Sequence, residues 1–174
     1  CVNLVIVGNY MVGVEYSFNV PNNNAVEVWD ISNPAAPVSV SNLTLAEEGW
    51  SLAVYGDYLY VASDWSVPIL SIIDFKDPTN ISWIKDIQLA EIPYHLRIVG
   101  DKLVHSATSI LRLFDLTDPL NPTQVDAEAL SNGRTCAVDG TRIINRDIIH
   151  KVVGADLQFV QNFDYHGNSQ GDGF

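Results

Sequence analysis

Apolar stretches interrupted by short polar turns recur along the chain. In four places such a stretch is split by a glycine followed by Asn, Asp or Thr: VGNYMV from Val7, YGDYLY from Tyr55, VGDKLV from Val99 and DGTRII from Asp139. Glycine, asparagine and aspartate accept the positive φ of tight turns, so the flanking stretches can pair across the turn. Each string therefore predicts a β-hairpin, and the four glycines lie 48, 44 and 40 residues apart.

A second string follows the first three hairpins. VWDISNPAAP (Val28 to Pro37) recurs as IIDFKDPTNI (Ile72 to Ile81) and LFDLTDPLNP (Leu113 to Pro122), with the aspartates 44 and 41 residues apart. The aspartate can accept backbone N–H groups of the following turn, and the proline fixes φ and ends the strand. Because every unit needs these residues for its turn, we interpret them as structural rather than catalytic: Asp30, Pro34, Asp74, Pro78, Asp115 and Pro119.

Two independent markers with one period indicate a repeat protein. The hairpin, a third strand that runs into the aspartate and a fourth strand after the proline give four antiparallel strands per unit, which is typical of a propeller blade. The predicted fold is therefore an all-β propeller with four-stranded blades over residues 2–45, 49–89, 93–130 and 133–163. Residues 164–174 are polar and glycine-rich, and we interpret them as a tail or linker.

The two strings together resemble the LVIVD-repeat family of β-propellers, whose units combine an apolar run, a GxYAYVA-like hairpin and an LxIxDxSxPxxP turn. The resemblance covers residues 2–127. It implies an exported or cell-surface protein, because members are mainly uncharacterised proteins of that kind, and it favours a propeller larger than four blades. Residues 134–163 keep the hairpin but lack the proline turn, so the pattern defines the last blade least.

Two arrangements of the blades remain open. Four blades can close into a ring, or they can form part of a larger propeller of about six to eight blades. A disulfide between Cys1 and Cys136 would favour the ring. Relative to the hairpin glycines, however, the two positions differ by three residues, roughly 10 Å of strand, which exceeds the reach of a disulfide. We therefore expect Cys136 to pack as a small core side chain.

Composition and charge exclude several classes of protein and partner. Of 174 residues, 47% are hydrophobic and 17% are charged, which excludes a disordered chain. The net charge of −12, without a basic cluster, argues against nucleic acid as a partner. The uncharged run from Cys1 to Val14 is too short for a membrane span. We expect an extracellular or cell-surface protein, with two interpretations of Cys1 open: a lipid anchor, or the simpler one of a boundary within a larger exported protein.

Alignment of the four units identifies candidate binding residues. Before each hairpin one column is polar, and its neighbour holds Trp50, Tyr94 and Arg134. Period-2 alternation places the polar column opposite the core columns, near the mouth of the propeller channel. With acids of the entering loops and residues of a middle loop, these columns give one candidate face: Glu47, Glu48, Trp50, Asp64, Trp65, Glu91, Tyr94, His95 and Arg134.

Aromatic rings beside carboxylates can stack on a sugar or hold a cationic group. We therefore expect a non-catalytic binding or scaffold module that presents this face to a protein or glycan partner, although the same rings could simply plug the channel. Two alternatives remain: a hydrolase or lyase with His95 as base and Glu48 or Glu91 as acid, and a building block that self-associates through open blade edges. No recognisable nucleotide, hydrolase or zinc motif occurs, so we expect no cofactor and no metal.

Overall fold

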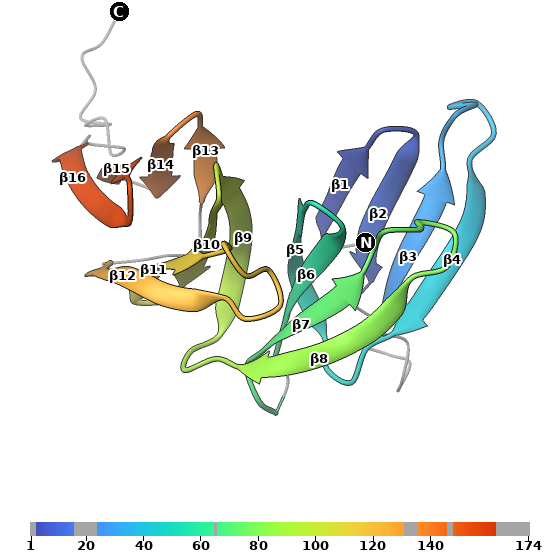
Figure 1. Ribbon diagram of the computed structural model, residues 1–174, viewed down its shortest axis with the longest axis horizontal. Coiled ribbons are helices and arrows are strands. Elements are labelled where there is room, and N and C mark those ends of the chain that lie inside the picture. Colours follow the sequence, from blue (N-terminus) through green and yellow to red (C-terminus); the bar gives the residue numbers. More distant parts are fainter. Residues whose placement is uncertain (1–2, 16–23, 65, 131–135, 146–147, 163–174) are drawn as a thin grey trace, which may run out of the picture.

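The described residues form four antiparallel sheets, each with four strands in chain order (Figure 1). A computed structural model gives the fold, and it describes residues 3–15, 24–64, 66–130, 136–145 and 148–162. The prediction of an all-β fold built from four-stranded antiparallel blades is confirmed. The predicted tail, residues 164–174, lies outside the described residues.

Each sheet corresponds to one sequence unit. The first contains β1 (Asn3–Val7), β2 (Tyr10–Glu15), β3 (Ala25–Asp30) and β4 (Val38–Thr44). The second contains β5 (Gly49–Tyr55), β6 (Tyr58–Ser63), β7 (Ile69–Asp74) and β8 (Ser82–Gln88). The third contains β9 (Pro93–Val99), β10 (Lys102–Ala107), β11 (Ile110–Asp115) and β12 (Thr123–Ala129). The fourth contains β13 (Ala137–Asp139), β14 (Arg142–Asn145), β15 (Ile148–Val153) and β16 (Asp156–Asn162).

Side-chain capped turns connect the third and fourth strands of the first three sheets. Asp30 Oδ1 accepts a hydrogen bond from the Ser32 N–H at 2.7 Å. Asp74 and Asp115 accept from the residue two positions on at 3.0 and 2.7 Å. Three residues later a second side chain makes the same kind of bond, namely Asn33, Asp77 and Asp118. The repeated string therefore encodes two consecutive turns of the Asx type, and Pro34, Pro78 and Pro119 lie within the second.

Three apolar cores hold the sheets together, one between each successive pair. The second and third sheets each contribute a cross-strand trio to the core shared with the sheet before it. In the second sheet this trio is Val54, Leu59 and Ile73, which are paired across β5, β6 and β7 and pack in the core with Val12 and Val28. The corresponding trio of the third sheet, Ile98, Leu103 and Phe114, lies in the second core.

The second sheet also presents a trio toward the sheet that follows. In the second sheet Ala53, Tyr60 and Ile72 are paired across the same three strands and belong to the second core. The second sheet is therefore apolar on both faces, as its sequence predicts, and it packs against a neighbouring sheet on each side. Burial of two faces per sheet is the main source of stability in such an array.

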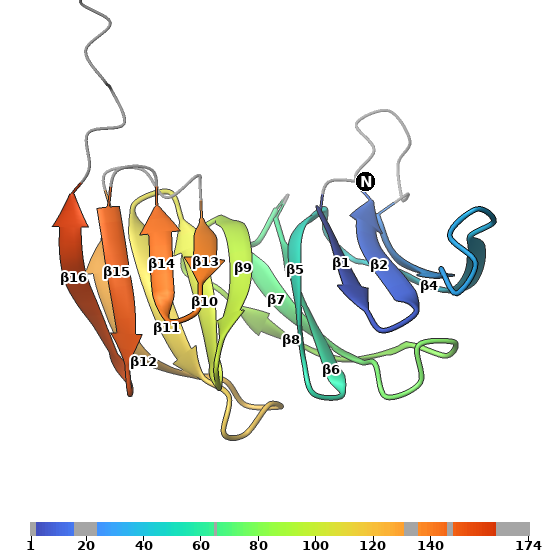
Figure 2. The ribbon, with the colours of Figure 1, turned by 90° about the horizontal axis from the view of Figure 1, so that it is seen from above.

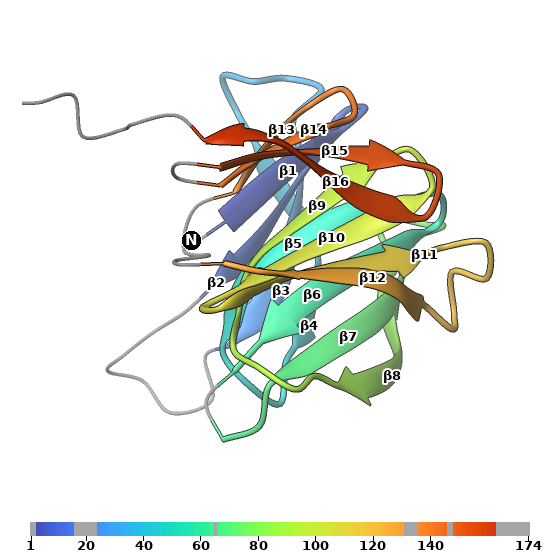
Figure 3. The same ribbon diagram turned by 90° about the vertical axis from the view of Figure 1, so that its left-hand side faces the viewer.

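The four sheets lie along an arc in chain order, with the first and fourth sheets at opposite ends (Figures 1 and 2). Figure 3 looks onto the fourth sheet, where β15 and β16 are nearest the viewer. None of the three cores formed by the described residues joins the first sheet to the fourth. The sequence left two arrangements open, and the described residues form an open arc and not a closed four-bladed ring, because they form no core between the first and fourth sheets.

Cys136 is a buried free thiol in the core between the third and fourth sheets. Burial raises the pKa of its thiol to about 11, so the thiol stays protonated and packs as an apolar group. Cys1 lies outside the described residues. In the part of the chain that the structure describes, no helix is long and apolar enough to cross a membrane.

Candidate binding face

Two glutamates of the candidate face, Glu47 and Glu91, accept hydrogen bonds from serines of a neighbouring loop. Glu47 accepts hydrogen bonds from the backbone N–H of Ser66, at 3.1 Å, and from its hydroxyl. Glu91 occupies the corresponding position of the next unit and accepts from the Ser109 hydroxyl at 3.1 Å. In both sheets the acid of the loop that enters the first strand thus binds a serine of the loop after the second strand. This repeated pattern assigns both carboxylates a structural part.

Glu91 has a second partner that the sequence did not indicate. The guanidinium of Arg112 on β11 lies 3.8 Å from its carboxylate, and the Arg112 side chain is 11% exposed. A buried guanidinium needs a counter-ion. Glu91 therefore neutralises an internal cation, and it is a weaker candidate for a general acid than its sequence position suggested.

Trp50 and Tyr94 form an aromatic pair that bridges two sheets. Trp50 is on β5 and Tyr94 on β9, and their ring centroids are 6.3 Å apart at an interplanar angle of 72°. This edge-to-face geometry is favourable for aromatic rings. Both side chains are only partly buried. The sequence alignment placed the two in one column, and the structure brings them into contact because β5 and β9 are neighbouring first strands.

The indole of Trp50 is held in place by a hydrogen bond. Its Nε1–H donates to the carbonyl oxygen of Asp64 at 3.1 Å, and the Asp64 N–H donates to the carbonyl oxygen of Glu48 at 3.0 Å. Burial, followed by the charge of Glu47, raises the pKa of the Asp64 carboxyl. Glu48 is 9% exposed, which is rare for a carboxylate. The Trp50 indole and the backbone of Asp64 and Glu48 are therefore joined by consecutive hydrogen bonds beside the start of β5.

His95 follows Tyr94 on β9 and is partly buried. The member of the same polar column in the second sheet, Ser51, is fully buried, and its hydroxyl accepts a hydrogen bond from the Leu96 N–H at 2.9 Å. At Ser51 the polar column thus links two sheets instead of facing solvent. Trp65 and Arg134, which the sequence also assigned to this face, lie outside the described residues.

His105 is a buried polar residue that sequence reasoning did not select. It lies on β10, 1% exposed, with its ring centroid 6.3 Å from that of Phe114. Burial, followed by the positive charge of Arg112, lowers the pKa of its imidazole to about 4. Its residue type gave no signal of this, because only the register of β10 turns it into the core. Among the described residues, no three His, Cys, Asp or Glu side chains lie close enough together to hold a metal ion.

Comparison with known families identifies part of the repeat. The LVIVD repeat matches residues 15–44 and 48–86, which span β3 and β4 of the first sheet and most of the second. No curated protein sequence matches the chain.

Solved structures with similar folds have little sequence in common with this chain. A protein from Lactobacillus plantarum is 9% identical with a TM-score of 0.74, and the match covers 92% of this chain and 54% of that one. A functionally unknown protein from Desulfotomaculum acetoxidans is 12% identical with a TM-score of 0.68, covering 92% and 70%. The computationally designed Ika8 protein is 12% identical with a TM-score of 0.64, covering 88% and 46%. The chain thus spans about half the length of the first of these structures.

Proposed function

We propose that this chain, whose residues 15–44 and 48–86 match the LVIVD repeat, is a non-catalytic binding module of an extracellular or cell-surface protein. In this proposal the surface around Trp50 and Tyr94, at the starts of β5 and β9, contacts a protein or glycan partner. The observation that carries the proposal is the Trp50–Tyr94 pair, which is partly exposed although two sheets contribute to it.

The surroundings of the pair suit a hydroxyl-rich or cationic ligand. The bond from Trp50 to the Asp64 carbonyl fixes the indole before a ligand arrives, so little side-chain entropy is lost on binding. A fixed aromatic ring stacks on the apolar face of a sugar or on a cation. The Asp64 carboxylate, which is only partly buried, supplies acceptors for hydroxyl or ammonium groups. Binding rather than catalysis is favoured because Glu47 and Glu91 are engaged by loop serines and Arg112.

The test applies the labelled full chain to an array of immobilised oligosaccharides and to an array of extracellular proteins. Trp50→Ala is expected to weaken binding to the best ligand by about tenfold or more, as loss of an aromatic anchor does. Trp83→Ala is the matched control, because Trp83 is 55% exposed on the outer strand β8, away from the pair.

Two results would overturn the proposal. One is the absence of a ligand on either array. The other is a ligand whose affinity falls equally in the Trp50→Ala and Trp83→Ala variants. Circular dichroism and a thermal melt of both variants establish that each is folded.

A further inference from the structure

We propose that the group bound at the Trp50–Tyr94 pair is an alkylammonium cation, carried by a lysine side chain or by a small quaternary ammonium compound, and not a neutral sugar. This inference rests on the proposed function, because it names the chemical class of ligand for the same aromatic pair. It is carried by the hydrogen bond of the indole, by the charge of the loops beside the pair and by the partners of the nearby basic side chains.

The only hydrogen-bond donor of the Trp50 side chain is already engaged. The indole Nε1–H donates to the carbonyl oxygen of Asp64 at 3.1 Å, and tryptophan has no other polar side-chain atom. Trp50 therefore presents a ligand with the face of its ring, which is electron-rich and attracts cations. A sugar can stack on the same face, but its hydroxyl groups gain no partner from the indole.

Tyr94 adds a second ring from the neighbouring sheet. The two ring centroids are 6.3 Å apart and the ring planes meet at 72°. An edge-to-face contact leaves each ring with a face that the other ring does not cover, and both side chains are partly exposed. A cation is attracted to a ring when it lies within about 6 Å of the ring centroid. The pair is therefore a preformed aromatic surface for one cationic group.

The loops beside the pair carry negative charge. Asp64, whose carbonyl holds the indole, has a partly buried side chain, and burial, followed by the charge of Glu47, raises the pKa of its carboxyl. The two carboxylates are thus close enough to repel each other. Among the described residues, no lysine or arginine forms an ion pair with either of them. A cationic ligand relieves this repulsion, whereas a neutral sugar does not.

The sequence around these loops is acidic throughout. Residues 24–75 contain no lysine or arginine, and they hold seven acids: Glu27, Asp30, Glu47, Glu48, Asp57, Asp64 and Asp74. A region with charges of one sign raises the local concentration of ligands with the opposite charge. The long-range field of this part of the chain therefore favours the same ligand class as the aromatic rings do.

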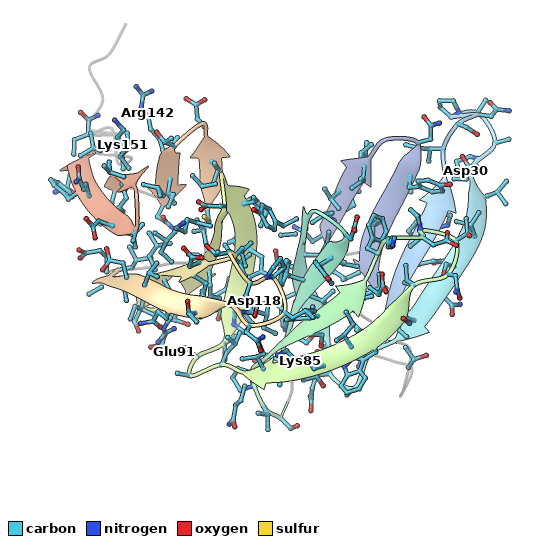
Figure 4. All side chains as sticks on the ribbon, viewed as in Figure 1. Asp30, Lys85, Glu91, Asp118, Arg142 and Lys151 are labelled. Atoms are coloured by element: carbon cyan, nitrogen blue, oxygen red, sulfur yellow. The ribbon has the colours of Figure 1, made fainter. Side chains whose placement is uncertain are left out.

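Basic side chains of the second and third sheets have partners away from Trp50. Lys85 on β8 donates to Asn121 Oδ1 at 2.7 Å, and the guanidinium of Arg112 lies 3.8 Å from the Glu91 carboxylate. Figure 4 shows Lys85 on β8 and Glu91 in the loop that leads from β8 to β9. These cations serve the contacts between and within the sheets, so a positive charge at the aromatic pair comes from the ligand.

Nitrogen–proton correlation NMR of the full chain tests the proposal, with the Trp50 indole Nε1–H as the reporter. The probes are choline and N-acetyl-lysine methylamide. The control ligand is the uncharged isostere of choline, in which a carbon atom replaces the nitrogen. We expect both cations to shift the reporter signal with dissociation constants of about 1 to 10 mM, and the isostere to bind at least about fivefold more weakly. The tighter of the two cations shows whether a lysine side chain or a quaternary ammonium compound is the better ligand.

A pair of charge variants tests the part of Asp64. Asp64→Asn removes the carboxylate charge and keeps the backbone carbonyl that holds the indole, so it should weaken choline binding about threefold or more. Asp57→Asn is the matched control, because it removes the same charge from an exposed position at the opposite end of β6. It should change the dissociation constant by less than about twofold.

Three results would overturn this inference: no shift with either cation, equal binding of choline and its isostere, or equal weakening by the two charge variants. Its failure is distinguishable from failure of the proposed function. If an oligosaccharide from the array binds in a Trp50-dependent manner while neither cation does, the proposed function is supported and the cation is excluded. If neither the arrays nor the cations yield a Trp50-dependent ligand, both are overturned.

Discussion

The hydroxyl of Tyr60 donates a hydrogen bond to the carbonyl oxygen of Pro119 at 2.8 Å, and this bond ties the second sheet to the proline turn of the third. Tyr60 is fully buried, and burial raises the pKa of its phenol, so the hydroxyl remains a donor throughout the stable range. Two kinds of interaction therefore stabilise this turn. The carboxylates of Asp115 and Asp118 bind its backbone N–H groups, and Tyr60 of the preceding blade binds its Pro119 carbonyl.

Removal of this hydroxyl should loosen the contact between the second and third sheets. Tyr60→Phe is expected to lower the free energy of unfolding by about 1 to 2 kcal/mol, since a buried carbonyl loses its donor while ring packing is kept. Urea unfolding measures the change. Tyr55→Phe, in the same core, should cost clearly less, and equal losses in the two variants would contradict the assignment.

The hairpin glycines are required because their backbone has a positive φ, and not because a side chain would clash with neighbouring atoms. Gly56 has φ of +58°, and a Cβ built on it meets no atom within 4 Å. Gly56→Ala should therefore lower the free energy of unfolding by about 1 kcal/mol through left-handed strain alone. Gly56→Asn should cost less, because asparagine tolerates this conformation. Thermal melts of both variants measure these losses. An alanine variant as stable as the parent chain would show that the left-handed conformation of Gly56 costs alanine nothing.

Acidification should weaken the third sheet through His105. The imidazole pKa is about 4 in the folded chain against 6.5 for the free side chain, so the unfolded chain binds the proton first as pH falls. Stability contributed by the neutral ring is complete above about pH 6.5 and is lost between pH 6.5 and 4. A difference of this size corresponds to roughly 3 kcal/mol.

The His105→Leu variant tests this titration. Urea unfolding at pH 7.5 and pH 4.5 should show a smaller pH dependence in the variant than in the parent chain. An unchanged dependence would mean that other groups cause the acid sensitivity.

Asp115 should be the most sensitive of the three repeat aspartates. It binds the Thr117 N–H and also the ammonium of Lys102 at 2.9 Å, and Lys102 is 5% exposed. Hydrogen bonds from Thr117 and then Lys102 lower the pKa of Asp115 to about 2. Its contribution to stability is therefore present above the ordinary carboxyl pKa near 4 and is lost as pH falls from 4 to 2.

Comparison of Asp115→Asn with Asp30→Asn separates the two contributions. Asparagine can keep the turn bond in both, but only Asp115→Asn removes a partner from a buried ammonium. The melting temperature should fall further for Asp115→Asn at pH 7, and the gap between the variants should narrow toward pH 2. A larger fall for Asp30→Asn would show that the ion pair contributes little.

The four-stranded blade can be predicted from the sequence alone. The period of the glycine and Asp-Pro markers predicts four four-stranded units because each marker has one local solution: a left-handed turn for Gly56, and a side-chain capped turn for Asp74. Such turns depend only on neighbouring residues, so their pattern is readable without the rest of the molecule.

How the blades are joined, and which partners the side chains of the candidate face have, follow from contacts between distant parts of the chain. The sequence places Glu47 and Glu91 on the candidate face, whereas their hydrogen bonds to Ser66 and Ser109 depend on how each blade folds. His105 became a buried group through the register of β10. Whether the arc closes depends on the curvature between sheets, which is set by the packing of many side chains from distant units. No short stretch of sequence encodes it, so the arc is seen only in the assembled sheets.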